Sequence, residues 1–481
     1  MTQTRLITDT FEYAGRWFLP GCDDYTVEGT MKYTKGDIRL KIRGPLRDET
    51  RYQTVRPPYW FHRENEKVDT LLGITEEGLQ ITLENCVMVK QTNSLDGTGM
   101  KNVITHYLAS FMCIGTHYAK PSDRNFDEVT ITYSNFKEWI NESGISTDQD
   151  FHSNTFSITA VTPPSYEGNL TEDFKYVIWH NMKNPGFQRD RFDADIVQNT
   201  LFTIKSEKSH YYQEFHKIFY RLQNFMMMCI KASIRPLLIT GRTLDPEYKS
   251  VLIYPGEVDV YGEHTVVRND QMFLPFRNLS NNIETIFQNW LQSYDELEDG
   301  FDLFFEVMVN SKLYPQDKFE NIIQALEAYH RGRFDDELME KSRYKRMIDD
   351  ILDQLTDSNQ KDWIKKNRTR GNDLSLSQKL VQLCEQFPYI FLDINKRDEF
   401  VVLVQDTRNY FAHHATKLKE MATKNTELFY LEQRLNVLMT ACMLSELRLG
   451  ELELERFIMR YTHMQRQVSL VWASDPYDWI I

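Results

Sequence analysis

One short stretch indicates the fold class of the first half of this chain: Asp37-Ile38-Arg39-Leu40-Lys41-Ile42-Arg43. Its apolar residues alternate with its cations, and a period of two residues is typical of a strand with one buried face. Similar alternation recurs on both sides, around residues 31–33, 79–83, 87–89, 107–113 and 129–133. Strands this frequent, without helical periods between them, predict an antiparallel sandwich or barrel.

The next part of the chain mixes the two periods. Short strands are expected near residues 156–160 and 174–178, and two more at 251–254 and 265–268. Between them, over residues 208–233, apolar side chains recur every three or four positions, which predicts a long helix. We therefore expect a β-rich domain over residues 1–150 and a second α+β unit over residues 151–285.

From about residue 283 the apolar residues recur only at helical spacing. Helices are expected near residues 283–294, 319–329, 336–355, 375–387, 394–421 and 426–448, and a polar loop over residues 357–372. In the last helix Leu428, Leu431, Leu435 and Leu438 form a stripe that either the domain core or a second protomer must bury. An all-α domain over residues 300–465 and a tail over 466–481 complete the predicted α+β multidomain fold.

Composition excludes several classes of protein. The 481 residues carry a net charge of -14, so any contact with nucleic acid must come from a local patch. The six cysteines are scattered, which excludes a zinc ribbon or a CxxC redox site. There is no GxxxxGK[ST] or HExxH motif, no apolar run near the roughly 20 residues of a membrane span and no signal-peptide core. We expect a cytoplasmic protein without membrane contact, metal or other cofactor.

The strongest local signal for function is Asp406-Thr407-Arg408-Asn409-Tyr410-Phe411-Ala412-His413-His414. Arg408 and His413 form the only Arg-x4-His spacing in the sequence. Asn409 precedes His413 by four residues, so both project from one face of a helix. An arginine and two histidines on a polar helix face are most often solvated surface residues. The spacing alone does not decide whether these residues are such surface residues or form a functional site.

Three segments together resemble a known family. The Arg-Asn-x-x-x-His pattern in an all-α region is similar to the motif of the HEPN ribonucleases. The segment Gly15-Arg16-Trp17-Phe18-Leu19-Pro20-Gly21, followed by Val27-Glu28-Gly29-Thr30, resembles the opening of the ApeA N-terminal domain. The segment Gln324-Ala325-Leu326-Glu327-Ala328-Tyr329-His330-Arg331 resembles the first long helix of the ApeA-like HEPN domain. Phe18 departs from the family, which often has a second Trp there.

The resemblance implies an activity. It predicts a HEPN endoribonuclease of abortive anti-phage defence, with transfer RNA as the expected substrate, working as a homodimer in which two motifs face each other. In such an enzyme the 2′-OH of RNA attacks the adjacent phosphorus without a metal and leaves a 2′,3′-cyclic phosphate. His413 would move the proton, Arg408 would hold the phosphate charge, and Asn409 would orient the phosphate or the imidazole.

Further residues are expected to support this site. His414 is the alternative base if the helix is shifted by one residue, and Glu327 is expected to hold Arg408 in place. Four cations, Lys365, Lys366, Arg368 and Arg370, lie close to Trp363 and form a candidate clamp for the RNA backbone, although such a run is usually a solvated loop.

The remaining expectations concern partners and alternatives. The N-terminal region has no catalytic constellation, and we expect it to sense a phage-derived trigger protein through its sheet edges and loops; the competing interpretation is a scaffold that only stabilises the dimer. For the C-terminal domain, the competing class is a HEPN fold that binds RNA or a protein without cutting.

Overall fold

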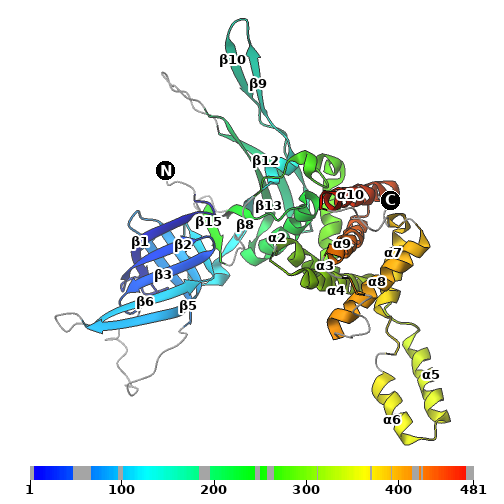
Figure 1. The fold of residues 1–481 in the computed structure, drawn as a ribbon. Helices are drawn as coiled ribbons and strands as arrows, with labels where there is room; N and C mark the ends of the chain where they lie inside the picture. The colour runs from blue at the N-terminus through cyan, green and yellow to red at the C-terminus, as the bar shows by residue number, and fades with distance from the viewer. Residues whose placement is uncertain are drawn as a thin grey trace. The chain divides into compact units, whose positions relative to one another are not determined.

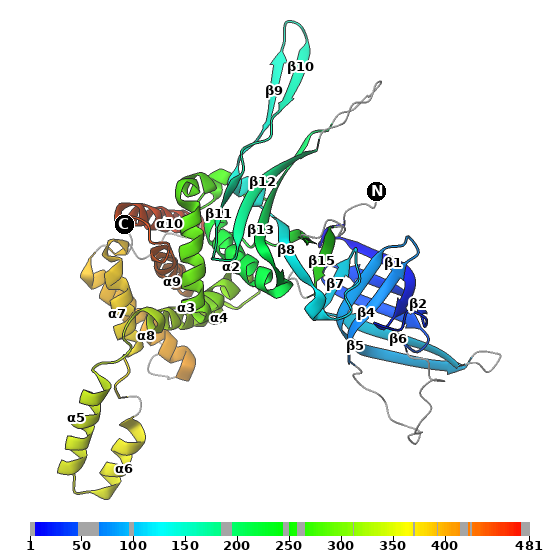
Figure 2. The ribbon, with the colours of Figure 1, turned by 180° about the vertical axis from the view of Figure 1, so that it is seen from behind.

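The computed structural model describes residues 5–46, 67–95, 101–183, 195–243, 250–256, 265–310, 312–368, 371–391, 393–413, 422–423 and 426–472. The chain divides into two compact units. The first, Met1–Ile230 with Ile234–Glu284, is β-rich, and the second, Lys231–Ser233 with Thr285–Ile481, is helical (Figures 1 and 2). The predicted α+β multidomain class, strands first and helices after them, is confirmed.

Six strands of the first unit close into an antiparallel barrel. They are β1 (Thr10–Phe18), β2 (Val27–Thr34), β3 (Asp37–Arg43), β4 (Lys67–Thr75), β5 (Gln80–Leu95) and β6 (Lys101–Ala109). They pair in the circular order β1-β2-β3-β6-β5-β4, and β4 returns to β1. Ile38, Leu40 and Ile42 of β3 are buried inside, while the cations between them face outward, as the alternation predicts.

Trp17 explains why glycines recur on the strands beside it. Its side chain is only 1% exposed, and a Cβ at Gly73 would lie 2.5 Å from its ring. A Cβ at Gly29 would lie 2.9 Å from the same ring. Only glycine leaves room for the indole at these two positions, one on each strand beside β1.

The sheet continues beyond the barrel from β5. The order is β5-β7-β15-β14-β8-β13-β12-β11, so thirteen strands belong to one sheet among the described residues. The added strands are β7 (Phe111–Ile114), β8 (Asn125–Tyr133), β11 (Tyr166–Asn169), β12 (Lys175–Lys183), β13 (Val197–Tyr211), β14 (Pro236–Arg242) and β15 (Val251–Pro255). Because β8 pairs with β13 and β14, one sheet holds strands from both predicted N-terminal domains; their division at residue 150 stays a prediction.

Two helices and a hairpin complete the first unit. Helices α1 (Phe136–Ile140) and α2 (Tyr212–Ile230) pack against β13, and α2 also packs against β8. Strands β9 (Ile145–Asp150) and β10 (Thr155–Ala160) pair only with each other and project as a separate hairpin (Figure 1). Short 3-10 turns lie at Pro121–Asp123, Asn269–Gln271, Phe276–Asn278 and Ser280–Asn282.

The strand expected at residues 265–268 is wrong, because this segment is irregular. The side chain of Asn135 takes the place of a neighbouring strand: its Oδ1 accepts a hydrogen bond from Val267 N at 3.1 Å, and its Nδ2 donates to the carbonyl of Thr265 at 3.2 Å. Two backbone groups that a neighbouring strand would pair are therefore satisfied by one side chain.

The second unit is built from helices throughout its described residues. They are α3 (Ile283–Val309), α4 (Pro315–Arg333), α5 (Lys341–Gln354), α6 (Ser358–Asn367), α7 (Leu376–Gln386), α8 (Ile394–His413), α9 (Thr426–Ser445) and α10 (Glu451–Trp472), with a 3-10 turn at Pro388–Ile390. Helix α9 is the centre, since it packs against α4, α7 and α10. The stripe of Leu428, Leu431, Leu435 and Leu438 is fully buried within this unit, so it does not require a second protomer.

The loop expected over residues 357–372 is wrong in its first part, which forms α6. Asp357 caps this helix: its carboxylate accepts hydrogen bonds from the backbone amides of Asn359 and Gln360. The periodicity did not predict α6 because hardly any apolar residues mark a face on it. Helix α5 begins at Lys341 rather than near residue 336, because residues 337 and 373 form an isolated β-bridge there.

Candidate active site

Helix α8 carries Arg408, Asn409 and His413 and is fixed along its inner face. Phe400, Val401, Val404 and Thr407 are its buried residues, and α8 packs against α7. At its first turn the carboxylate of Asp393 accepts a hydrogen bond from the amide of Lys396 at 2.9 Å. A short polar cap and an apolar face therefore determine the rotation of the helix about its axis.

The C-terminal half of α8 has two further anchors beside the motif. Thr407 is completely buried, and its Oγ1 accepts a hydrogen bond from the amide of Thr423 at 3.1 Å. The ring of Phe411 lies edge-on to the ring of Phe319 in α4, with centroids 6.0 Å apart. These contacts bracket Arg408 and hold this part of the helix against the domain.

The three motif side chains diverge on the helix. At about 100° per residue, Asn409 and His413 are separated by about 40°, whereas Arg408 and His413 are separated by about 140°. Arg408 and Asn409 are half-buried and His413 is exposed. Within the described part of the chain, no hydrogen bond or ion pair engages the side chains of Arg408 and His413. One copy of the motif therefore presents an imidazole and a guanidinium to solvent in different directions.

Of three further residues predicted for the site, the structure describes Glu327. His414 and Arg370 lie outside the described residues. Glu327 lies on α4, half-buried, two turns beyond Phe319. No hydrogen bond or ion pair between Glu327 and Arg408 occurs among the described residues, so its supporting role stays a prediction.

Helix α6 and the residue that follows it carry the described cations of the predicted RNA clamp. Lys365, Lys366 and Arg368 are exposed, and none of them forms an ion pair with a described carboxylate. Trp363 is 68% exposed, an unusual position for an indole in water, and Lys366 follows it by three residues on the neighbouring surface. Figures 1 and 2 show α6 lying beside α5. The arrangement offers fixed positive charge next to a free aromatic face.

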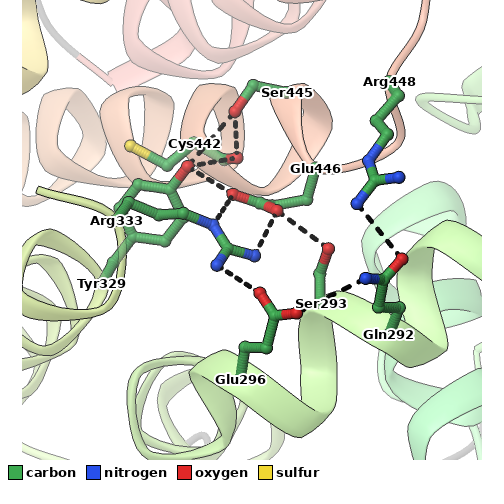
Figure 3. Close-up of polar contacts among 9 residues, drawn as sticks. All are labelled: Gln292, Ser293, Glu296, Tyr329, Arg333, Cys442, Ser445, Glu446 and Arg448. Carbon is green, nitrogen blue, oxygen red and sulfur yellow. Dashed lines mark hydrogen bonds and ion pairs between the residues drawn. The ribbon is translucent and has the colours of Figure 1, made fainter.

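Sequence reasoning missed a polar cluster that joins three helices (Figure 3). Glu446, just after α9, accepts two parallel hydrogen bonds from Arg333 of α4, at 2.8 Å from Nε and 2.7 Å from Nη2. It also accepts hydrogen bonds from Tyr329 and from Ser293 of α3, both at 2.8 Å. Arg333 reaches Glu296 of α3 as well, at 2.5 Å.

The electrostatics of this cluster follow from its hydrogen bonds. Burial by itself would raise the pKa of Glu446, but the hydrogen bonds from Arg333, Tyr329 and Ser293 outweigh it and hold the pKa below its ordinary value. The carboxylate is therefore charged at neutral pH and ties α3 and α4 to the end of α9. No pattern in the sequence points to the pair, because its members are 113 residues apart.

No group of three or more His, Cys, Asp and Glu side chains in the described ranges is arranged to hold a metal ion. None of the helices in those ranges combines the length and the apolarity that a membrane crossing needs.

Comparison with known families agrees with the resemblance. The model of ApeA N-terminal domain 1 matches residues 12–290, and the model of the Apea-like HEPN domain matches residues 320–451. No curated protein and no solved structure shows significant similarity to the chain. Since the first match alone spans more than half of its length, the chain belongs to the ApeA family, with an ApeA N-terminal domain followed by an ApeA-like HEPN domain.

Proposed function

We propose that this protein is a metal-independent endoribonuclease that cuts RNA, with transfer RNA as the expected substrate, in the cytoplasm of a phage-infected cell. Membership of the ApeA-like HEPN family implies an anti-phage function of the HEPN type, and HEPN domains are generally ribonucleases. The single observation that supports cleavage by this chain is the placement of Arg408, Asn409 and His413 on an anchored helix with their polar groups open to solvent.

The proposed chemistry uses groups that this helix supplies. His413 takes the proton of the RNA 2′-OH, the oxygen attacks the adjacent phosphorus, and the bond from phosphorus to the 5′-oxygen breaks. The products are a 2′,3′-cyclic phosphate and a free 5′-oxygen, which takes up a proton to become a 5′-OH. Arg408 offers its planar pair of donors to the phosphate oxygens as negative charge builds on them.

The divergence of the motif supports a site made by two copies. Arg408 and His413 point about 140° apart on one helix, so they do not converge on one phosphate by themselves. On the same solvent face of α8 as Asn409 and His413, Val402 is 54% exposed. An apolar side chain in this position fits a homodimer in which the second copy covers the face and supplies the second His413 as proton donor.

The first unit is proposed to sense a phage-derived trigger protein. The hairpin of β9 and β10 supports this role, because Phe151 at its turn is 82% exposed and Phe156 is 62% exposed. An isolated two-stranded hairpin with a bare apolar face is marginally stable in water. A partner that covers these rings would order the hairpin.

The test is cleavage of total transfer RNA by the wild-type chain and by His413→Ala, each in excess EDTA. Wild type is expected to cut and to leave cyclic phosphates, and the variant is expected to be inactive but still folded by circular dichroism. Cleavage that stops with chelator and returns with magnesium would contradict the proposed chemistry. RNA binding by both proteins without cleavage by either would favour the non-catalytic interpretation.

A further inference from the structure

The outer surface of the barrel carries a row of basic side chains across three adjacent strands. Lys41 of β3 lies directly opposite His106 of β6, and His106 lies directly opposite Lys90 of β5. Neighbouring strands are about 4.8 Å apart, so the two lysines are held within about 10 Å by the sheet itself. All three side chains point outward, since the residues beside Lys41 on β3 are buried inside the barrel.

Further cations extend this row along β3. Arg39 and Arg43 flank Lys41 at two-residue spacing, about 7 Å away on either side, and both are exposed. Arg39 is paired with Asp37 at 2.7 Å. Lys41, Arg43 and Lys90 have no ion pair with any described carboxylate. In a chain with net charge -14, three strongly basic side chains on β3 and a fourth on β5 are a marked local departure.

A groove runs beside the row. It has a volume of about 610 Å³ and is lined by cations from β1 and β3, namely Arg16, Lys41 and Arg43. Gly15 and Gly29 also line it, as do the acidic residues Glu28 and Glu76. The positive charge is thus concentrated on the β3 side, where the groove joins the row of Lys41, His106 and Lys90.

The lowered pKa of His106 is consistent with a positive electrostatic potential at this surface. Its pKa is lowered by burial and then by the charges of Lys41, Lys90 and Arg39. Lys41, Lys90 and Arg43, which form no ion pair with a described carboxylate, surround a neutral imidazole, and described aromatic side chains are absent from the row. Such a surface attracts phosphate groups and does not distinguish bases.

We propose that the outer face of β3, β6 and β5 binds the phosphate backbone of RNA through Lys41, Arg43 and Lys90. The choice of RNA over an acidic protein rests on the proposed function, since the same chain carries the ribonuclease motif. The barrel then contributes affinity that is independent of sequence, while the HEPN domain performs the cut.

The test uses full-length protein carrying His413→Ala, so that the RNA stays intact, and a labelled single-stranded RNA of about 20 nucleotides. Fluorescence anisotropy is measured between about 50 and 200 mM salt for this protein and for the same protein with Lys41→Glu and Lys90→Glu. We expect the charge reversal to weaken binding at least about tenfold. The plot of log affinity against log salt should become shallower by about 1.4, because each contact to a single strand contributes about 0.7.

A matched control distinguishes the effect of this surface on binding from the effect of the change in net charge. Lys137→Glu with Lys183→Glu makes the same change in net charge at exposed positions outside the barrel, and binding should stay within about twofold. Equal losses in both double variants, or no loss in the barrel variant, would overturn the proposal. Tighter binding of polyglutamate than of RNA with the same charge would overturn the assignment to RNA. Cleavage by the His413→Ala protein would refute the proposed nuclease mechanism and leave the binding result intact.

Discussion

Arg333 holds the carboxylate of Glu446 with two parallel hydrogen bonds, at 2.8 and 2.7 Å, from the last turn of α4 to the residue that follows α9. Glu446 is buried, so removal of its charge deprives the partly exposed guanidinium of Arg333 of its bidentate partner and leaves Glu296 as its other ion-pair partner. This relationship holds the helical unit together around the helix that carries most of its core.

The first prediction concerns stability. Glu446→Gln keeps the shape of the side chain but removes its charge, and it should lower the free energy of unfolding of the helical unit by about 2–4 kcal/mol. Glu207→Gln is the matched control, because it breaks the exposed pair with Lys175 and should cost less than about 0.5 kcal/mol. Urea unfolding followed by circular dichroism at the helical band measures both. Equal effects of the two substitutions would show that the cluster does not stabilise the fold.

The second prediction concerns pH. The pKa of Glu446 in the folded protein lies below its ordinary 4.5. Folding therefore stabilises the ionised carboxylate relative to the protonated one, and the ionised carboxylate stabilises the fold. This stabilisation is complete above pH 4.5 and is lost as the pH falls through the folded-state pKa. The difference in stability between wild type and Glu446→Gln should therefore be constant at neutral pH and shrink in acid. A difference that grows in acid would contradict the assigned direction.

The third prediction concerns the phosphate contact. Arg408→Lys preserves the charge but not the planar pair of donors, and it should slow single-turnover cleavage by at least about 100-fold. Arg456→Lys changes an exposed arginine of α10 in the same way and should cut at the wild-type rate. If Arg408→Lys stays within about threefold of wild type, Arg408 has a structural role instead.

The fourth prediction concerns assembly. Val402→Glu places a charge on the solvent face of α8 and should convert a dimer into monomers and abolish cleavage together. Leu452→Glu makes a similar change at a more exposed site on α10, and it should neither dissociate the dimer nor reduce cleavage. Light scattering and cleavage are measured on the same samples. Full activity of a Val402→Glu monomer would refute the two-copy site.

The fifth prediction concerns sensing. Replacement of Phe151 and Phe156 by Ser should abolish protection of cells against phage, while the purified protein still cuts RNA. Both side chains are largely exposed, so the fold should tolerate the change. Plaque counts measure protection, and normal protection by this variant would place the sensing surface elsewhere.

The strands of the barrel were predictable because one face of each is buried, and burial on alternate residues leaves a mark in the sequence. Closure of the barrel could not be predicted, because it depends on which distant strands pair, as β1 pairs with β4. Helix α6 was missed because it buries almost nothing. The strand expected at 265–268 failed because one asparagine side chain, 130 residues away, satisfies that backbone.

The candidate site, like the fold, could be predicted from the sequence only in part. The spacing of Arg408 and His413 could be read from the sequence, together with the family that it resembles. Their divergence by about 140° follows only once residues 394–413 are known to form one unbroken helix whose inner face is fixed by Val404 and Thr407. The pairing of Arg333 with Glu446 joins two ordinary charged residues, and nothing local distinguishes them from surface residues.

The continuous sheet also bears on aggregation. A sheet that closes into a barrel at one end has its terminal strand at the other, and here that strand is β11. An exposed edge is a template on which another chain can add a strand. At β11 this is countered by Glu284, whose carboxylate accepts hydrogen bonds from the backbone amide of Asn169 at 2.8 Å and from its side chain at 2.9 Å. The edge is only four residues long, and a charged group already occupies the donor at its end. Any chain that extends the sheet there must first displace that carboxylate.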